Sequence, residues 1–211
     1  MATRRGRSTG AGGARVRPGA VRIIGGRWRG RRLPIAPVQG LRPTPDRVRE
    51  TLFNWLAPVL PGARCLDLFA GTGALGLEAC SRGAREVVLV EQDPLARTML
   101  AANVERLGAT DVTIVAADAV RWLATAPSPF DVVFLDPPYR SDLLPACCAR
   151  LQADGWLAPA AWIYVESPAS ATGVVPPQWS AYRSLNAGQV HAALYRIMPA
   201  TAVETATPMG E

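Results

Sequence analysis

The sequence has 211 residues, of which 49% are hydrophobic, enough for one α/β domain with a buried core and a short extension. It contains no apolar run of the ~18 residues that span a bilayer and no signal peptide, so we expect a soluble, cytoplasmic protein without a membrane partner. The net charge of +6 is uneven, because Met1–Pro45 contains 11 arginines and no acid whereas the rest contains 12 arginines and 17 acids. This asymmetry favours a polyanionic partner for the basic arm.

The cysteines and the histidine do not form a metal-binding motif. Cys65, Cys80, Cys147 and Cys148 include no CxxC pair, and His191 is the single histidine. We therefore expect no metal site. A chain of this size with an ordinary core does not need disulfides, so we also expect reduced, mostly buried cysteines.

The first 45 residues divide into a tail and a basic extension. Residues 1–19 are rich in Arg, Gly and Ala, which predicts a disordered tail that is either dispensable or in loose contact with phosphate. Residues 20–45 begin with two short apolar segments around Gly25 and Gly30, typical of a small β-hairpin. Trp28 lies among arginines there. This combination suits RNA, because bases stack on aromatic rings and phosphates pair with arginines. The alternative is an ordinary surface hairpin that packs on its tryptophan.

The next segment, LRPTPDRVRETLFNWLAPVL, predicts a helix from apolar residues at helical spacing. Thr44 is a natural N-cap and Pro45 fits the first helical position. Arg42, Arg47 and Arg49 lie near its start. They face either a phosphate, the mouth of an active site, or only solvent.

From residue 64 onward the chain alternates strands and helices. Helices are expected at residues 73–83, 94–107 and 143–153. Strands are expected at residues 64–70, 86–92, 111–117, 130–136 and 162–167, with two more in 179–198. The repeated strand–helix units predict a mainly parallel sheet covered on both faces, with a terminal hairpin that adds antiparallel strands. We expect this domain over residues 46–199, followed by a flexible tail at 200–211.

The first strand of this domain is followed by a glycine motif. Gly71, Gly73 and Gly76 satisfy GxGxxG, and Glu91, 20 residues after Gly71, ends the next strand. The spacing predicts a site for an adenosine ribose but does not choose between NAD and S-adenosylmethionine. Asp67, just before the glycine turn, would repel the pyrophosphate of NAD and attract the ammonium of S-adenosylmethionine. The alternative role of Asp67 is to cap the following turn.

Two further aspartates follow later strands, Asp118 after the third and Asp136 after the fourth, at the edge where open α/β sheets bind ligands. Asp118 follows the third strand, where its carboxylate can accept from an adenine amino group while the Ala119 N–H serves a ring nitrogen. A helix cap is the alternative for Asp118.

The fourth strand ends in DPPY. An exocyclic base amine is a poor nucleophile, because its lone pair is delocalised into the ring. Acceptors such as the Asp136 carboxylate and the Pro137 carbonyl can bind its two N–H groups and aim the lone pair. Pro138 helps to fix the direction of that carbonyl, and Tyr139 can stack on a base taken out of its helix. A proline-rich turn without chemistry is the alternative.

Taken together, these motifs resemble the RsmD family of bacterial 16S ribosomal RNA guanine-N2 methyltransferases, from about Arg22 to Met198. The matching stretches are RIIGGRWRGRRLP, LRPTPDRVRETLFNWL, CLDLFAGTGALGLEA, DPPY, GWLAP, IYVES and AGQV. The resemblance implies a Rossmann-like class I S-adenosylmethionine-dependent methyltransferase. Such a fold has a mainly parallel seven-stranded sheet with an antiparallel C-terminal hairpin, here with a small N-terminal β-hairpin.

The resemblance also implies roles for residues and partners. The cofactor would be S-adenosylmethionine, held by Asp67, Phe69, Ala70, Gly71, Thr72, Gly73, Glu91, Gln92, Asp118, Ala119 and Asp136. The catalytic motif would be Asp136, Pro137, Pro138 and Tyr139. RNA would be bound by Arg22, Arg27, Trp28, Arg29, Arg31, Arg42 and Arg47. The enzyme, a monomer, would methylate N2 of one guanine of 16S ribosomal RNA in the small ribosomal subunit or its assembly intermediate.

Three other functions remain as alternatives. A DNA adenine-N6 methyltransferase also uses DPPY, but this chain has no obvious room for a domain that recognises a DNA target. An NAD-dependent oxidoreductase would share GxGxxG and Glu91, and Asp67 and DPPY disfavour it. The third is a non-catalytic RNA-binding assembly factor on an old enzyme fold, which the intact motifs disfavour.

Overall fold

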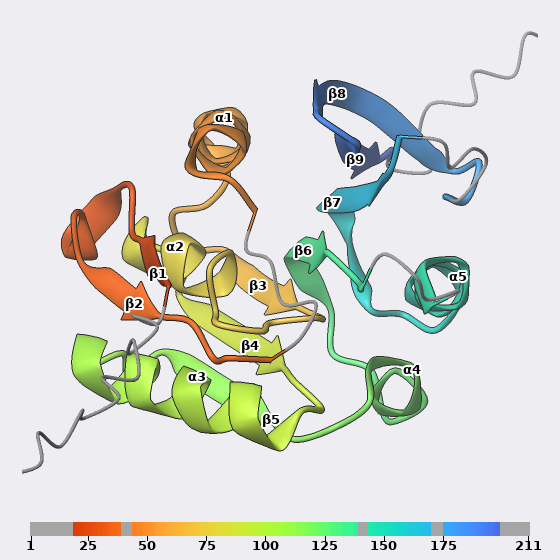
Figure 1. Ribbon diagram of the computed structural model, residues 1–211. Coiled ribbons are helices and arrows are strands. Elements are labelled where there is room, and N and C mark those ends of the chain that lie inside the picture. Colours follow the sequence, from red (N-terminus) through yellow and green to blue (C-terminus); the bar gives the residue numbers. More distant parts are fainter. Residues whose placement is uncertain (1–18, 39–43, 139–142, 170–174, 199–211) are drawn as a thin grey trace, which may run out of the picture.

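The computed structural model describes residues 19–38, 44–138, 143–169 and 175–198. Arg42, Tyr139 and nearly all of the two predicted tails lie outside the described residues. The described part forms a sheet flanked by helices, with a small second sheet at its N-terminal end (Figure 1).

The main sheet has seven strands in the order β5-β4-β3-β6-β7-β9-β8. Strands β3 to β7 run parallel, and β9 runs antiparallel to both β7 and β8. Their bounds are β3 Arg64–Asp67, β4 Glu86–Val90, β5 Val112–Val115, β6 Phe130–Leu135, β7 Leu157–Pro168, β8 Trp179–Ala187 and β9 Val190–Ile197. The mainly parallel sheet with an antiparallel C-terminal hairpin is thus confirmed.

Helices cover both faces of this sheet (Figure 1). Helices α1 (Asp46–Leu56), α2 (Gly76–Ser81) and α3 (Pro94–Leu107) share one hydrophobic cluster, and α4 (Ala119–Trp122) and α5 (Leu143–Ala153) share the other. Alternate residues of each buried strand enter opposite clusters, as the period of two in a strand requires. Within the described ranges, no helix combines the length and apolar character needed to cross a membrane.

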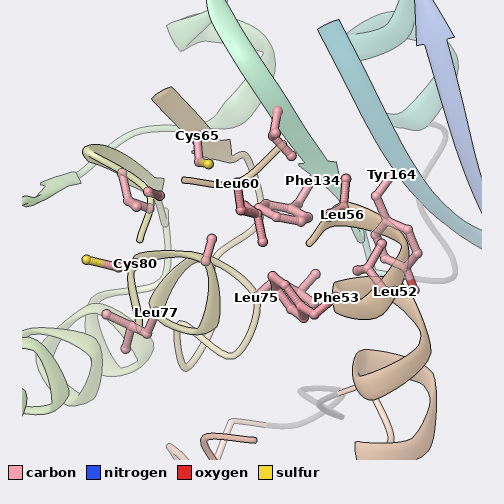
Figure 2. Packing of buried hydrophobic residues seen from close by; sticks show 14 of the residues in the cluster. Leu52, Phe53, Leu56, Leu60, Cys65, Leu75, Leu77, Cys80, Phe134 and Tyr164 are labelled. Atoms are coloured by element: carbon pink, nitrogen blue, oxygen red, sulfur yellow. The ribbon is translucent and has the colours of Figure 1, made fainter. Parts of the chain in front are cut away.

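The first cluster fixes helix α1 against the sheet. Leu52, Phe53 and Leu56 of α1 pack toward Phe134 of β6 and Tyr164 of β7 (Figure 2). The Phe53 and Phe134 ring centroids lie 5.8 Å apart. This packing places helix α1 beside β6 and β7, and both strands contribute polar groups to the site described below. All four cysteines are free and buried, as predicted.

The N-terminal extension forms the predicted two-stranded hairpin, in which β1 (Ala20–Arg22) pairs antiparallel with β2 (Arg32–Pro34). A single turn of 3₁₀-helix, η1 (Gly26–Trp28), lies between the strands. A Cβ on Gly26 would lie 1.8 Å from the Ser81 carbonyl oxygen, so only glycine allows the hairpin to approach α2 this closely. The hairpin is therefore docked onto the main domain.

Two expectations for the start of α1 are wrong. Pro45 occupies the N-cap position without a side-chain hydrogen bond, and the Thr44 hydroxyl instead donates to Glu166. Arg49, expected to face phosphate, solvent or an active-site mouth, has no exposed side-chain surface. Its guanidinium donates to the carbonyls of Arg22 and Thr44 and to the Asp46 carboxylate. Backbone carbonyls and carboxylates near the start of α1 need hydrogen-bond donors. The local sequence around Thr44 and Arg49 does not indicate that these two side chains supply them.

Candidate active site

A cavity of about 290 Å³ opens at the carboxyl ends of β3, β4, β5 and β6. Parallel strands of open α/β sheets bind ligands at this edge. The predicted cofactor residues line the cavity, with the exception of Gly73. They are Asp67, Phe69, Ala70, Gly71, Thr72, Glu91, Gln92, Asp118, Ala119 and Asp136. Pro137, Pro138, Thr44 and Val38 also line it, so segments from five different parts of the chain meet there.

The glycine turn after β3 brings backbone close to the cavity. Gly71 has a φ of +52° and lines the cavity, so a side chain there would be strained. Gly73 has a φ of +82°, and a Cβ there would lie 2.6 Å from a side-chain carbon of Leu77 and 2.7 Å from one of Leu100. Gly73 therefore allows α2 and α3 to pack behind the turn. It was expected to contact the cofactor, but it is not among the residues that line the cavity.

Asp67 ends β3 and is 2% exposed at the inner end of the glycine turn. Its Oδ2 accepts the N–H of Gly76 at 2.9 Å, which is the capping interaction considered as its alternative role. Burial raises the pKa of Asp67 to about 7, with a smaller contribution from the charge of Glu91, against the backbone hydrogen bonds it accepts from Gly76 and Phe69. A nearby cation would return this carboxyl to its ionised form.

Two further carboxylates are oriented by backbone groups around the cavity. Glu91 accepts the N–H of Gly71 on one oxygen at 2.8 Å and that of Asp93 on the other at 2.7 Å. Asp118 caps α4 and accepts the N–H of Arg121 at 2.9 Å. Because each oxygen of a carboxylate has two lone-pair sites, both side chains retain acceptor capacity for a ligand.

The DPP turn follows β6 directly. Burial raises the pKa of Asp136 well above its ordinary range, and the charges of Glu166 and Asp67 add to this effect, while a hydrogen bond from Thr44 opposes it. Pro137 is buried and Pro138 is exposed, and both line the cavity. Neither proline has an N–H, so these two residues bring no backbone donor to the cavity.

The sequence interpretation missed a buried cluster beside Asp136. The Thr44 hydroxyl lies 2.6 Å from Glu166 Oε1 and 3.4 Å from Asp136 Oδ2. The Tyr164 hydroxyl lies 2.8 Å from the same oxygen of Glu166. One signal was available, because Glu166 lies near the end of a strand, like the other carboxylates of the site. The role of Thr44 had no such signal.

The arginines proposed for RNA contact lie mostly on the surface of the extension. Arg22, Arg29, Arg31 and Arg47 are exposed, and Arg22 forms an ion pair with Asp46 at 3.5 Å.

Arg27 is also exposed but its guanidinium has partners within the chain, whereas Trp28 is buried. Arg27 pairs with Asp111 at 3.1 Å and lies over the Trp28 ring at 4.1 Å. Trp28 is only 9% exposed and belongs to the core cluster, so its ring is not available to stack on a base. The surface-hairpin alternative, in which the tryptophan packs the hairpin, describes Trp28 better. Among the described residues, no group of three or more His, Cys, Asp or Glu side chains could hold a metal.

The fold and the position of the cavity define a Rossmann-like methyltransferase. The solved structure of yhhF from Escherichia coli superposes with a TM-score of 0.79 at 50% identity, covering 86% of this chain and 99% of that one. The Thermus thermophilus 16S rRNA N2 G1207 methyltransferase RsmC, solved in complex with AdoMet and guanosine, has the same fold. Its TM-score is 0.67 at 23% identity, covering 86% of this chain and 50% of that one.

The chain belongs to the family of ribosomal RNA small subunit methyltransferase D, and residues 21–196 match the family model described as Conserved hypothetical protein 95. The Escherichia coli K12 protein named ribosomal RNA small subunit methyltransferase D is 50% identical over 179 residues. That alignment covers 84% of this chain and 90% of the relative. The family predicted from the sequence motifs is confirmed.

Proposed function

We propose that the protein transfers a methyl group from S-adenosylmethionine to the exocyclic N2 of one guanine in 16S ribosomal RNA. One observation supports this most directly: Asp136 and Pro137 open into the same cavity as Asp67 and Glu91. Acceptors suited to an amine therefore lie beside acceptors suited to a cationic nucleoside.

The cavity residues fit S-adenosylmethionine better than a dinucleotide. Asp67 lies where a pyrophosphate would be repelled and where the α-ammonium would be attracted. Glu91 would accept from the ribose hydroxyls, Asp118 would accept from the adenine amino group, and the Ala119 N–H would serve a ring nitrogen. When bound, S-adenosylmethionine supplies an electrophilic methyl group on a sulfonium. The same arguments oppose the NAD-dependent alternative, which binding of NAD in calorimetry would restore.

The DPP turn prepares the amine for attack. The Asp136 carboxylate accepts one N–H of the amine, and the Pro137 carbonyl accepts the other. These two contacts favour a tetrahedral nitrogen whose lone pair is directed at the methyl group, so positioning accounts for most of the catalysis. The proton leaves during or after transfer, and a strong base is not required.

The choice of 16S ribosomal RNA rests on family membership together with the basic extension. The relative that is 50% identical is named for the small-subunit RNA, and exposed arginines of the hairpin suit its phosphates. The acceptor pair would serve N6 of adenine equally, so the DNA alternative is disfavoured by the family and not by the turn. We further propose that the protein acts in the cytoplasm, as a monomer, on the small subunit or its assembly intermediate.

The test uses radiolabelled S-adenosylmethionine and small ribosomal subunits from cells that lack this activity, followed by nucleoside analysis. Label in N2-methylguanosine of 16S RNA is the expected result. Label in another nucleoside would retain the chemistry and overturn the substrate. Cofactor binding without label would favour the non-catalytic assembly factor. Asp136→Ala should abolish transfer and keep cofactor binding, and unchanged turnover would refute the role of Asp136.

A further inference from the structure

A buried carboxylate, that of Glu166, lies behind the partly buried Asp136. Glu166 is 2% exposed and is not among the residues that line the cavity, whereas Asp136 and Thr44 are. The Thr44 Oγ1 stands between the two carboxylates, 2.6 Å from Glu166 Oε1 and 3.4 Å from Asp136 Oδ2. The Tyr164 hydroxyl donates to Glu166 from the core side, where the ring packs beside Leu52 (Figure 2).

This arrangement is unfavourable for stability alone. A buried carboxylate costs free energy unless a cation or several donors compensate it. Within the described part of the chain, neither Asp136 nor Glu166 forms an ion pair with an arginine. Burial also raises the pKa of Glu166, against the hydrogen bonds from Thr44 and Tyr164. The partly buried Asp136 and the buried Glu166, joined by one hydroxyl, instead form a short path for a proton that leads away from the cavity.

We propose that Glu166 is a positioning residue that draws the amine proton away from Asp136 through the Thr44 hydroxyl. This inference rests on the proposed function. Methyl transfer forms the N–C bond and breaks the S–C bond, whose electron pair stays on sulfur. The N–H bond then breaks, and its proton passes to Asp136 Oδ2. Asp136 gives a proton to Thr44 Oγ1 as Thr44 gives its own to Glu166 Oε1, so the amine ends neutral and Glu166 protonated.

The direction of the hydrogen bonds supports this path. Thr44 has a single proton, which it donates to Glu166 when its oxygen accepts from a protonated Asp136. Tyr164 also donates to Glu166, so Glu166 keeps one donor even when the single Thr44 proton is directed to an ionised Asp136. Arg49 holds the segment in place, because its Nε donates to the Thr44 carbonyl at 3.2 Å.

The charged and titratable groups around the path set the expected pH dependence. Asp67 on β3 and Glu166 on β7 both raise the pKa of Asp136, and the Thr44 hydrogen bond lowers it. Replacing Glu166 with a neutral amide removes a like charge, so the pKa of Asp136 falls. The Thr44 hydroxyl can donate to Asp136 only while Asp136 is ionised, so replacing Thr44 with valine removes a donor to the ionised form and the pKa of Asp136 rises. The two variants therefore move this pKa in opposite directions.

The experiment measures kcat against pH for the full chain with ribosomal subunits and saturating cofactor. Glu166→Gln and Thr44→Val should each lower kcat by about 100-fold, the lower end for positioned proton transfer. The pH of half-maximal kcat on the acidic side should fall in Glu166→Gln and rise in Thr44→Val. Thr44→Ser, which keeps the hydroxyl, should restore most of the loss. Asp154→Asn, an exposed acid on another face, serves as the unchanged control.

The outcomes separate this inference from the proposed function. If the wild-type protein transfers no methyl group, the proposed function itself is refuted. Two results with an active wild type would overturn only the role of Glu166. One is a pH of half-maximal kcat that is equal in the two variants or unmoved in both, and the other is a change in KM without a change in kcat. If Glu166→Gln does not fold, judged by circular dichroism and cofactor calorimetry, the contrast of Thr44→Val with Thr44→Ser still decides. Loss of a protonated-carboxyl infrared band in Glu166→Gln gives a readout independent of turnover.

Discussion

Glu78 joins three parts of the chain, and its replacement is the sharpest test of how the extension is attached. The side chain has no exposed surface. Its oxygens accept the N–H of Ile24 at 2.7 Å and of Gly25 at 2.8 Å, and Arg82 forms an ion pair with it at 2.7 Å. Nη1 of the buried Arg49 lies 3.8 Å away. Glu78→Ala should therefore weaken the attachment of the hairpin and leave Arg82 and Nη1 of the buried Arg49 without the Glu78 carboxylate.

The magnitude follows from these contacts. Hydrogen bonds to a charged acceptor contribute about 1.5–3 kcal/mol each, but contributions that share one acceptor do not add fully. Breaking a buried pair by removing one partner costs about 3–5 kcal/mol. We expect Glu78→Ala to lower the free energy of unfolding by about 4 kcal/mol, which corresponds to a fall in Tm of roughly 8–16 °C for a domain of this size.

Urea unfolding and hydrogen exchange measure the two consequences separately. The free energy of unfolding should fall, and amides of residues 20–36 should lose protection more than those of β3 to β6. Asp154→Ala is the matched control, because its ion pair with Arg150 joins two side chains that are each 41% exposed and should contribute below about 1 kcal/mol. A loss below 1 kcal/mol for Glu78→Ala, or unchanged protection of the hairpin, would refute the reasoning.

Three further predictions concern the cavity, the core and the extension. Because the pKa of Asp67 is raised to about 7, its attractive charge is lost as the pH falls, so affinity for S-adenosylmethionine should fall roughly tenfold from pH 8 to 6 with proton release on binding. Asp67→Asn should weaken binding and remove this pH dependence in calorimetry. Gly76→Ala places a Cβ 2.2 Å from a Leu89 methyl and should cost about 1–3 kcal/mol in urea unfolding. Replacing Arg29 and Arg31 with Gln should reduce the slope of log affinity for RNA against log salt by about 1–2, and an unchanged slope would exclude the hairpin as a phosphate contact.

Local sequence signals were sufficient where an element carries its own boundaries. Helix α3 begins after Asp93, whose carboxylate accepts from the N–H groups of Leu95 and Ala96, has Pro94 at its first position and ends at Gly108 in the left-handed conformation. Its expected range, 94–107, is the observed one. These signals act over one helical turn, so no distant residue is needed to read them.

The cavity was predictable to a similar extent, because strand ends of a parallel sheet converge on one edge. Asp67 ends a strand, Glu91 and Asp136 directly follow one, and Asp118 lies three residues after one, so topology alone brings these carboxylates to the same cavity. The position of Gly73 was not predictable, because motif spacing does not say which glycine faces the ligand and which faces the neighbouring helices.

The sequence by itself therefore determined the alternation of strands and helices, the caps of a helix such as α3, and the row of carboxylates at the strand ends. Only the tertiary structure decided that Trp28 turns into the core, that Arg49 is buried, and that Thr44 meets Glu166 rather than capping α1. Thr44 and Glu166 are 122 residues apart. A hydroxyl or a guanidinium binds whichever unpaired acceptor the packed chain brings nearest, and that acceptor is set by contacts between elements that local propensity does not encode.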